Sequence, residues 1–233
     1  MDEITEPLPL PVRRGPAEHE RREQIVEAAR HHFREHGYEK TSVSELAKAI
    51  GVSSAYVYRF FDSKQSIGEA VCSGTLTTIA QRMFALEAKS LPAADKLGKL
   101  YSLVLESGCE LFIKQRKMHE LVASAVSQNW QSVQNHRMAI RAVLRRIVID
   151  GREQGSFETE TPLEEVVSAL GLAMMPFAHP MMLEQREAAE LRASVDVVTA
   201  MVLRSLGPSS CPAEVGLPQR AASSKKKAAS KSK

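Results

Sequence analysis

Apolar residues recur at helical spacing along most of the chain. The first such stretch covers residues 17–36 and ends at Gly37, so we expect a helix there. Similar spacing predicts longer helices over about 92–115, 117–127, 129–154, 162–178 and 188–206. The inner face of the first helix is expected to consist of Ile25, Ala28, Ala29, His32, Phe33 and His36. No alternating strand pattern and no internal repeat accompanies these stretches, so the expected fold class is all-α.

A pair of short helices is expected after the first long one. Ser42, with Glu45 three residues later, forms the pattern of a capping box and starts the first of the pair. Gly51 then supplies a turn that needs a positive φ, and Ser53 caps the second short helix over about 54–60. Two helices joined by a glycine turn have the spacing of a helix-turn-helix, which makes the N-terminal part a three-helix head.

The second short helix gathers aromatic residues in a chain that is only 5% aromatic. With Val57 and Phe61 facing inward, its outer side is expected to present Ser54, Ala55, Tyr56, Tyr58 and Arg59. A soluble protein rarely exposes two tyrosines and an arginine on one short helix without a partner. Their hydroxyls and guanidinium, with Lys64 nearby, suit phosphate oxygens or a guanine edge. The alternative is that the aromatic rings only pack a small helical bundle.

Length and composition fit a globular protein, with 233 residues of which 43% are hydrophobic and 25% charged. No stretch approaches the roughly 20 apolar residues of a membrane span. The acidic, proline-bearing start does not resemble a signal peptide, so a cytoplasmic location without a membrane partner is expected. Cys72, Cys109 and Cys211 are far apart and odd in number, which favours free thiols over a disulfide framework or a zinc site.

The net charge of +3 comes from the C-terminal end. Residues 1–64 carry 10 Lys and Arg against 11 Asp and Glu, while residues 207–233 carry six against one. DNA binding must therefore rest on local geometry and not on overall charge. We expect a disordered arm over 1–16 and a disordered, lysine-rich tail over 207–233. Arg13 and Arg14 suit either a minor groove or a solvated arm, and the tail suits either non-specific phosphate binding or solubility.

Catalytic and metal-binding patterns are weak. His32 and His36 are four residues apart, which places two imidazoles on one helical face, but no third ligand accompanies them. Neither a nucleophile elbow nor a phosphate loop occurs in the sequence. We therefore expect no enzyme activity, no cofactor and no metal site.

The run from Arg22 to Val71 resembles the N-terminal domain of the TetR (tetracycline-repressor-like) family. The matching features are "IVEAARHHFREHGYEKTSVSELAKAIGVS", "YVYRFF" and "SKQSI". The resemblance implies that the second short helix enters the major groove of DNA. It places DNA-backbone contacts at Thr41, Ser42, Ser53, Tyr56, Tyr58 and Lys64. It places positions that face bases or the groove wall at Ser54, Ala55, Arg59 and Phe60.

The rest of the chain resembles this family in architecture only. The resemblance implies a helix-turn-helix DNA-binding domain over 17–64 and a larger helical ligand-binding and dimerisation domain over 65–206. Members form homodimers through their last two long helices, which fits 162–177 and 188–206 here. Both ranges carry an apolar stripe at helical spacing. The alternative is that these stripes pack only within one chain.

The resemblance also implies a ligand cavity among the middle helices. Large apolar residues that suit its wall are Tyr101, Leu105, Phe112, Met118, Val122, Trp130, Met138, Met174 and Phe177, with Met175 and Met181 beside them. Possible polar anchors are Asn129, Gln134, His136 and His179. Any one of these residues also fits a plain core or a surface position.

These observations predict a dimeric transcriptional regulator with double-stranded DNA as its partner. Its simplest form is a repressor that a small apolar or amphipathic effector releases from a pseudo-palindromic operator. One alternative is a regulator that activates transcription or needs no ligand. Another is a small-molecule-binding module without DNA function, because Ala55 stands where the family commonly has Gly and Tyr56 where it commonly has a small Thr.

Overall fold

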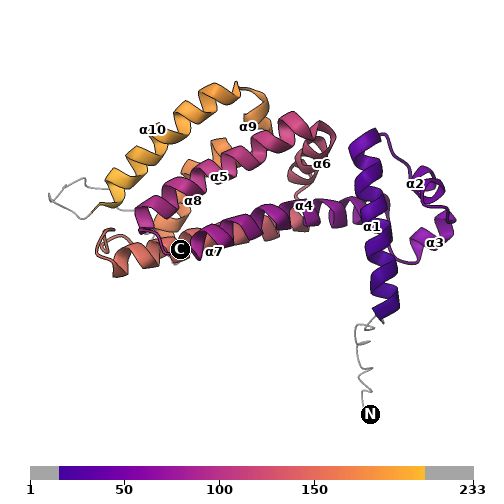
Figure 1. Cartoon of the computed structure of the whole chain (residues 1–233), viewed down its shortest axis with the longest axis horizontal. Coiled ribbons are helices and arrows are strands. Elements are labelled where there is room, and N and C mark those ends of the chain that lie inside the picture. Colours follow the sequence, from indigo (N-terminus) through magenta and orange to yellow (C-terminus); the bar gives the residue numbers. More distant parts are fainter. Residues whose placement is uncertain (1–15, 208–233) are drawn as a thin grey trace, which may run out of the picture.

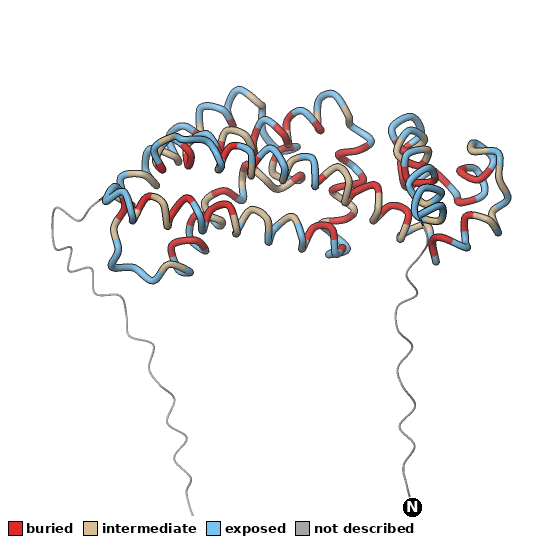
Figure 2. The backbone as a smooth tube through the Cα atoms, turned by 60° about the horizontal axis from the view of Figure 1, so that its bottom comes forward, coloured by how far each residue is buried: buried red, intermediate tan, exposed pale blue. Residues whose placement is uncertain are grey.

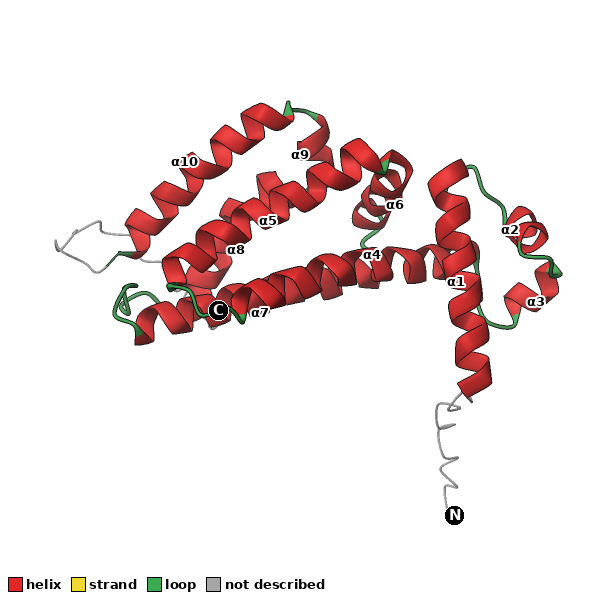
Figure 3. Cartoon of the chain, viewed as in Figure 1, coloured by secondary structure: helices red, strands yellow, loops and turns green. Residues whose placement is uncertain are grey.

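The computed structural model describes residues 16–207, and this part of the chain is all-α, as the sequence predicts (Figures 1 and 3). Its helices are α1 (Pro16–His36), α2 (Val43–Ala49), α3 (Ser54–Tyr58), α4 (Lys64–Glu87), α5 (Ala93–Lys114), α6 (Arg116–Ser127), α7 (Gln131–Glu153), α8 (Leu163–Ala178), α9 (Pro180–Glu184) and α10 (Ala188–Leu206). The expectations for Arg13, Arg14, Cys211 and the lysine-rich tail fall outside the described residues.

Helices α1–α3 form a head at one end of the molecule, and α5–α10 form a helical body (Figure 1). The long α4 connects the two, because it starts against α1 and then runs beside α7 into the body. Buried positions lie on the inward sides of the helices and exposed ones on the outer sides (Figure 2). Burial of these amphipathic faces is the main force that assembles the fold.

The caps expected around α2 and α3 are confirmed. The Ser42 hydroxyl accepts a bond from the Glu45 amide at 3.1 Å, and the Glu45 carboxylate accepts one from the Ser42 amide at 2.7 Å. Gly51 adopts φ 71°, a left-handed conformation that suits glycine, and the Ser53 hydroxyl caps α3. Helix α3 ends at Tyr58, two residues earlier than expected, and Arg59 follows as its C-cap.

The inner face of α1 differs from the expected stripe. Ile25, Val26, Ala29 and Phe33 are buried, whereas His36 is exposed and its ring lies 4.3 Å from that of His32. The expectation of an inward His36 was therefore wrong. Helices α2, α4 and α6 pack against α1, and its buried face runs through Ile25, Val26, Ala29 and Phe33 and does not include the last histidine.

The core of the head extends into the body. Trp130, in the turn between α6 and α7, packs edge-on against Tyr38 with ring centroids 5.6 Å apart, and Tyr38 in turn packs edge-on against Phe33. The same apolar cluster includes Leu121 and Met118 of α6. The head is thus held by contacts from α6 and α7 as well as by its connection through α4.

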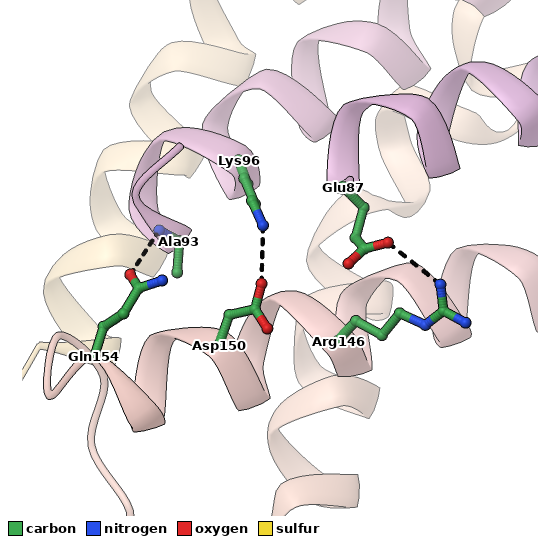
Figure 4. Close-up of polar contacts among 6 residues, drawn as sticks. All are labelled: Glu87, Ala93, Lys96, Arg146, Asp150 and Gln154. Atoms are coloured by element: carbon green, nitrogen blue, oxygen red, sulfur yellow. Dashed lines mark hydrogen bonds and ion pairs between the residues drawn. The ribbon is translucent and has the colours of Figure 1, made fainter. Parts of the chain in front are cut away.

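A second apolar cluster fills the body, where α5 lies between α10, α8 and α7. Polar contacts join α4 and α5 to α7 (Figure 4). The buried Lys96 ammonium of α5 meets the Asp150 carboxylate of α7 at 2.8 Å, and Arg146 meets Glu87 at 3.3 Å. These pairs set the relative positions of α4, α5 and α7.

Two prolines shape the end of α8. The helix continues through Pro176 to Ala178, and Pro180 then starts the five-residue α9. The sequence predicts a helix that ends at about residue 178, and the observed end at Ala178 falls before the second proline. A proline at the first position of a helix loses no intrahelical bond, which is why α9 tolerates it. Among residues 16–207 no helix is long and apolar enough to span a membrane.

Candidate DNA-binding and effector sites

The outer side of α3 presents polar and aromatic groups to solvent. Val57 and Phe61 are buried as expected, and Ala55, Tyr58 and Arg59 are exposed, with Tyr58 retaining 51% of its accessible surface. Ser54 and Tyr56 are half-buried, and the Arg59 guanidinium lies 5.8 Å from the Tyr56 ring centroid. A hydroxyl, a guanidinium and a small side chain are thus exposed close together in the sequence of α3 and its C-cap. Such groups suit the backbone and edges of a duplex groove.

Two of the expected DNA-facing residues point into the protein. Thr41 is 3% exposed, and its hydroxyl donates to the Gly37 carbonyl at 2.7 Å. Phe60 is 7% exposed, and its ring centroid lies 5.3 Å from that of Tyr56. The threonine hydroxyl stabilises the turn after α1, and the Phe60 ring packs against Tyr56 of α3. Burial of these two side chains does not favour the direct contacts with a duplex that the sequence predicted for them.

The remaining expected contacts are exposed or half-buried but engaged in local structure. The Ser42 hydroxyl donates to the Glu45 carboxylate at 2.8 Å, and the two bonds that this carboxylate accepts from Ser42 lower its pKa. The Lys64 ammonium donates to the Glu39 carbonyl at 3.1 Å and lies 4.5 Å from the Tyr38 ring centroid. Lys64 is therefore held at the edge of the head, near the start of α4.

A cavity of about 400 Å³ lies within the body between α4, α5, α6, α7, α8 and α9. Its interior is formed by buried apolar side chains, including Leu111, Val122, Leu144, Val167 and Leu183. The size and the apolar wall are typical of a small-molecule site. At Gly171 of α8 an added Cβ would meet no atom within 4 Å, which agrees with open space at that point of the wall.

Of the expected wall residues, Val122 and Met138 line this cavity, and so does Met175. The others do not. Tyr101, Leu105, Met174 and Phe177 belong to the solid core of the body, while Met118 and Trp130 belong to the core of the head. Phe112 packs against His119, with ring centroids 5.0 Å apart. Apolar periodicity marks a side chain as buried, but it does not distinguish a filled interior from an empty one.

Tyr101 shows why a large aromatic residue is not evidence of a cavity. It is fully buried, and its hydroxyl donates to the Leu170 carbonyl at 2.7 Å. Burial raises the pKa of this phenol, so it stays neutral. The side chain fixes α5 to α8 and leaves no open space around it.

Three of the four expected polar anchors line the cavity. Gln134 and His136 of α7 and His179, between α8 and α9, were expected as anchors, whereas Asn129 does not reach the cavity. Burial lowers the pKa of His136 to about 4, which keeps its imidazole neutral at physiological pH. Its Nδ1 and that of His179 are buried and have no hydrogen-bond partner among the described residues.

The sequence interpretation missed four further polar lining residues, His119, Arg137, Arg141 and Ser168. His119 is buried, its Nε2 lies 3.1 Å from the Glu184 carboxylate of α9, and burial lowers its pKa. The periodicity of α6, α7 and α8 places these residues beside apolar positions. Only the packing of the neighbouring helices shows that they border open space.

Thiols and possible metal ligands are scattered. Cys72 and Cys109 are buried and free, and burial raises the pKa of Cys72 to about 11. Among residues 16–207 no group of three or more His, Cys, Asp or Glu side chains is placed to hold a metal ion.

A helix-turn-helix head joined by a long helix to a helical body with an apolar cavity defines a class of protein, the helical DNA-binding regulators. Residues 25–71 match the family model described as "Bacterial regulatory proteins, tetR family". Residues 93–199 match the one described as "Tetracyclin repressor-like, C-terminal domain". The chain belongs to the TetR family and is a DNA-binding transcriptional regulator.

Known proteins agree with this assignment. The repressor KstR2 of Rhodococcus jostii is 25% identical over 62% of this chain and 71% of its own length. A TetR-family regulator from Pectobacterium atrosepticum superimposes with a TM-score of 0.69 at 18% identity, covering 83% of this chain and 98% of its own. FadR of Bacillus subtilis, solved in complex with stearoyl-CoA, superimposes with a TM-score of 0.59 at 19% identity. The match covers 79% of this chain and 98% of the FadR chain. The two solved structures support the fold.

Proposed function

We propose that this protein is a ligand-responsive repressor that binds a pseudo-palindromic operator as a homodimer. The outer side of α3 is the observation that carries DNA binding, because Tyr58 and Arg59 are exposed there beside the small Ala55. In this proposal residues 17–64 act as the DNA-binding domain and residues 65–206 as the regulatory domain.

Binding to the operator would use hydrogen bonds from the head to phosphates. The exposed hydroxyl of Tyr58 and the Lys64 ammonium at the edge of the head are suited to this contact, and the N-termini of α2 and α4 add free backbone amides. Arg59 is suited to a phosphate or a guanine edge. In a dimer the two heads would sit about one helical turn of DNA apart, roughly 34–36 Å.

Dimerisation would use α8 and α10. Helix α10 exposes large apolar side chains on its outer side, among them Val197 at 61% and Met201 at 58%. Small residues such as Ala169 lie on an exposed part of α8 and allow another helix to approach closely. An exposed apolar surface of this kind is typical of a protein interface.

The effector would occupy the cavity in the body. Helix α6 lines this cavity and also contacts the head, where Lys117 donates to the Glu35 carbonyl of α1 and Ser124 to the Glu39 carboxylate at 3.2 Å. A ligand that favours one position of α6 would therefore change the position of the head. It need only bind one state more tightly to shift the population between states.

A mobility-shift experiment on the DNA that flanks the protein's own reading frame tests the proposal. The wild-type dimer should shift a specific fragment, and Tyr58→Phe should weaken binding by about tenfold, because one hydrogen bond to a charged group is lost. Ile113→Ala is a matched control, since Ile113 is 64% exposed on α5. Equal binding by wild type and Tyr58→Phe would reject the assigned role of α3.

A further inference from the structure

The residues that line the body cavity include basic side chains but no acidic ones. Arg137 and Arg141 of α7 line it together with His119, His136 and His179, whereas none of its described lining residues is an Asp or a Glu. Two carboxylates contact lining residues from outside the lining: Glu184 is bonded to His119, and Glu164 to Arg141. The cavity thus offers positive charge and hydrogen-bond donors but nothing to neutralise a cation.

The positively charged residues line the exposed part of the cavity, and the apolar residues line its buried part. The exposed lining residues lie on neighbouring parts of two helices, with Arg137, Met138 and Arg141 on α7 and Ser168, Leu172 and Met175 on α8. The lining residues from α5 and α6 are mostly buried and apolar. The mouth therefore lies between α7 and α8, with both arginines beside it and the apolar interior behind it.

The two arginines differ in what they already bind. Arg141 donates to the Glu164 carboxylate of α8, a group that Arg145 also binds at 3.0 Å. Arg137 makes no ion pair with a carboxylate in the described part of the chain. Its guanidinium has five N–H donors in a planar fork, which matches a carboxylate better than any other side chain does.

The interior also lacks partners for two of its own polar atoms. The Nδ1 atoms of His136 and His179 are enclosed and make no hydrogen bond within the described structure, although both residues line the cavity. A buried polar atom without a partner is destabilising.

We propose that the effector is an amphipathic anion, whose apolar part fills the interior between α4 and α9 and whose acidic group binds Arg137 at the mouth. This inference rests on the proposed function, because it specifies the ligand of the same cavity. The two arginines would repel a cationic ligand, and no lining carboxylate is available to pair with its charge. A neutral ligand would leave the guanidinium of Arg137 without a charged partner.

Three probes with the same apolar chain separate these cases: dodecanoate, dodecanol and dodecyltrimethylammonium, each used below its micelle-forming concentration with the full-length protein. Dodecanoate should raise the thermal unfolding midpoint most, because a ligand of the folded state stabilises it by mass action. In Arg137→Gln its Kd should rise at least tenfold, while the Kd of dodecanol stays unchanged. Arg146→Gln is the matched control, since Arg146 is exposed on the same helix, does not line the cavity and pairs with Glu87.

A second variant locates the binding site. Gly171→Leu directs a side chain into the open space at the wall, where it would meet no existing atom within 4 Å at its Cβ. It should weaken binding of dodecanoate and dodecanol alike, whereas Gly171→Ala should leave both nearly unchanged.

The inference would be overturned by an alcohol or ammonium probe that binds as tightly as dodecanoate, or by unchanged affinity of Arg137→Gln for dodecanoate. Operator binding, measured in the same samples, distinguishes a failure of the anionic-effector proposal from a failure of the proposed ligand-regulated repression. If the neutral or cationic probe binds and releases the operator, ligand-regulated repression holds and the anionic class is wrong. If no probe binds while the operator is still shifted, the cavity has no effector role of this kind and only DNA binding remains.

Discussion

Trp130 of the body packs edge-on against Tyr38 of the head, with ring centroids 5.6 Å apart. Gly68 of α4 lies under both rings, because a Cβ added there would fall 2.6 Å from Tyr38 Cε2 and 2.9 Å from Trp130 Cη2. The close approach of head and body at this point depends on the absence of a side chain.

Gly68→Ala should therefore destabilise the protein despite the higher helix propensity of alanine. The added methyl forces two packed rings to move, which typically costs about 1–3 kcal/mol. Gly171→Ala provides the control, since its Cβ would meet nothing within 4 Å and replacing glycine by alanine within a helix gains about 0.5–1 kcal/mol. Chemical denaturation should move the two midpoints in opposite directions. A stabilised Gly68→Ala would contradict the packing described for these rings.

The Lys96–Asp150 pair should respond asymmetrically to substitution. The Lys96 side chain is 8% exposed and that of Asp150 33% exposed. Asp150→Ala leaves a buried ammonium without its partner and should cost about 2–4 kcal/mol, at the lower part of the usual range because the site is partly open. Lys96→Met replaces the buried charge with an apolar chain of similar length and should change stability by less than about 1 kcal/mol. Denaturation midpoints of both variants check this order, and equal losses would contradict it.

Acid should destabilise the protein partly through His136. Its pKa is lowered from 6.5 to about 4 by burial, so between these values the unfolded chain binds a proton that the folded protein does not. Stability from this residue is complete above pH 6.5 and is lost as the pH falls toward 4, with a loss of about 2 kcal/mol at pH 5 relative to pH 7.

His136→Leu should make the dependence of unfolding free energy on pH shallower across this window. It should also raise stability at pH 7, because it removes a buried Nδ1 without a partner, a group that costs about 1–3 kcal/mol. The dependence should not vanish, since burial also lowers the pKa values of His32 and His119. Denaturation at several pH values measures the slope, and an unchanged slope would show that His136 is not buried as a neutral group.

The proposed dimer interface predicts a change of oligomeric state. Met201→Glu places a charge on the exposed side of α10 and should convert a dimer to a monomer, with loss of operator binding. Met181→Glu is the control, because both methionines are similarly exposed, at 58% and 56%, but Met181 lies on α9. Light scattering reports the mass of each variant. A dimeric Met201→Glu protein would exclude α10 from the interface.

The sequence by itself determined the helices and their caps, because these depend on local patterns. Ser42 with Glu45, Gly51 and Ser53 identified the ends of α2 and α3 within a residue or two. Apolar periodicity located the other long helices but not the full length of α4, the longest. The five-residue α9 was missed, since so short a helix has no periodicity to detect.

Tertiary structure decided which buried side chains face open space and which fill the core. Tyr101 and Val122 have the same pattern in sequence, yet the first is locked to the Leu170 carbonyl and the second borders the cavity. The inward turn of Phe60 and the position of Arg137 at the mouth follow in the same way from which helix faces meet. Helical spacing reports only that a side chain lies on an inner or outer face. The distance to the neighbouring helix, which creates or removes a cavity, is set by all the packed side chains together.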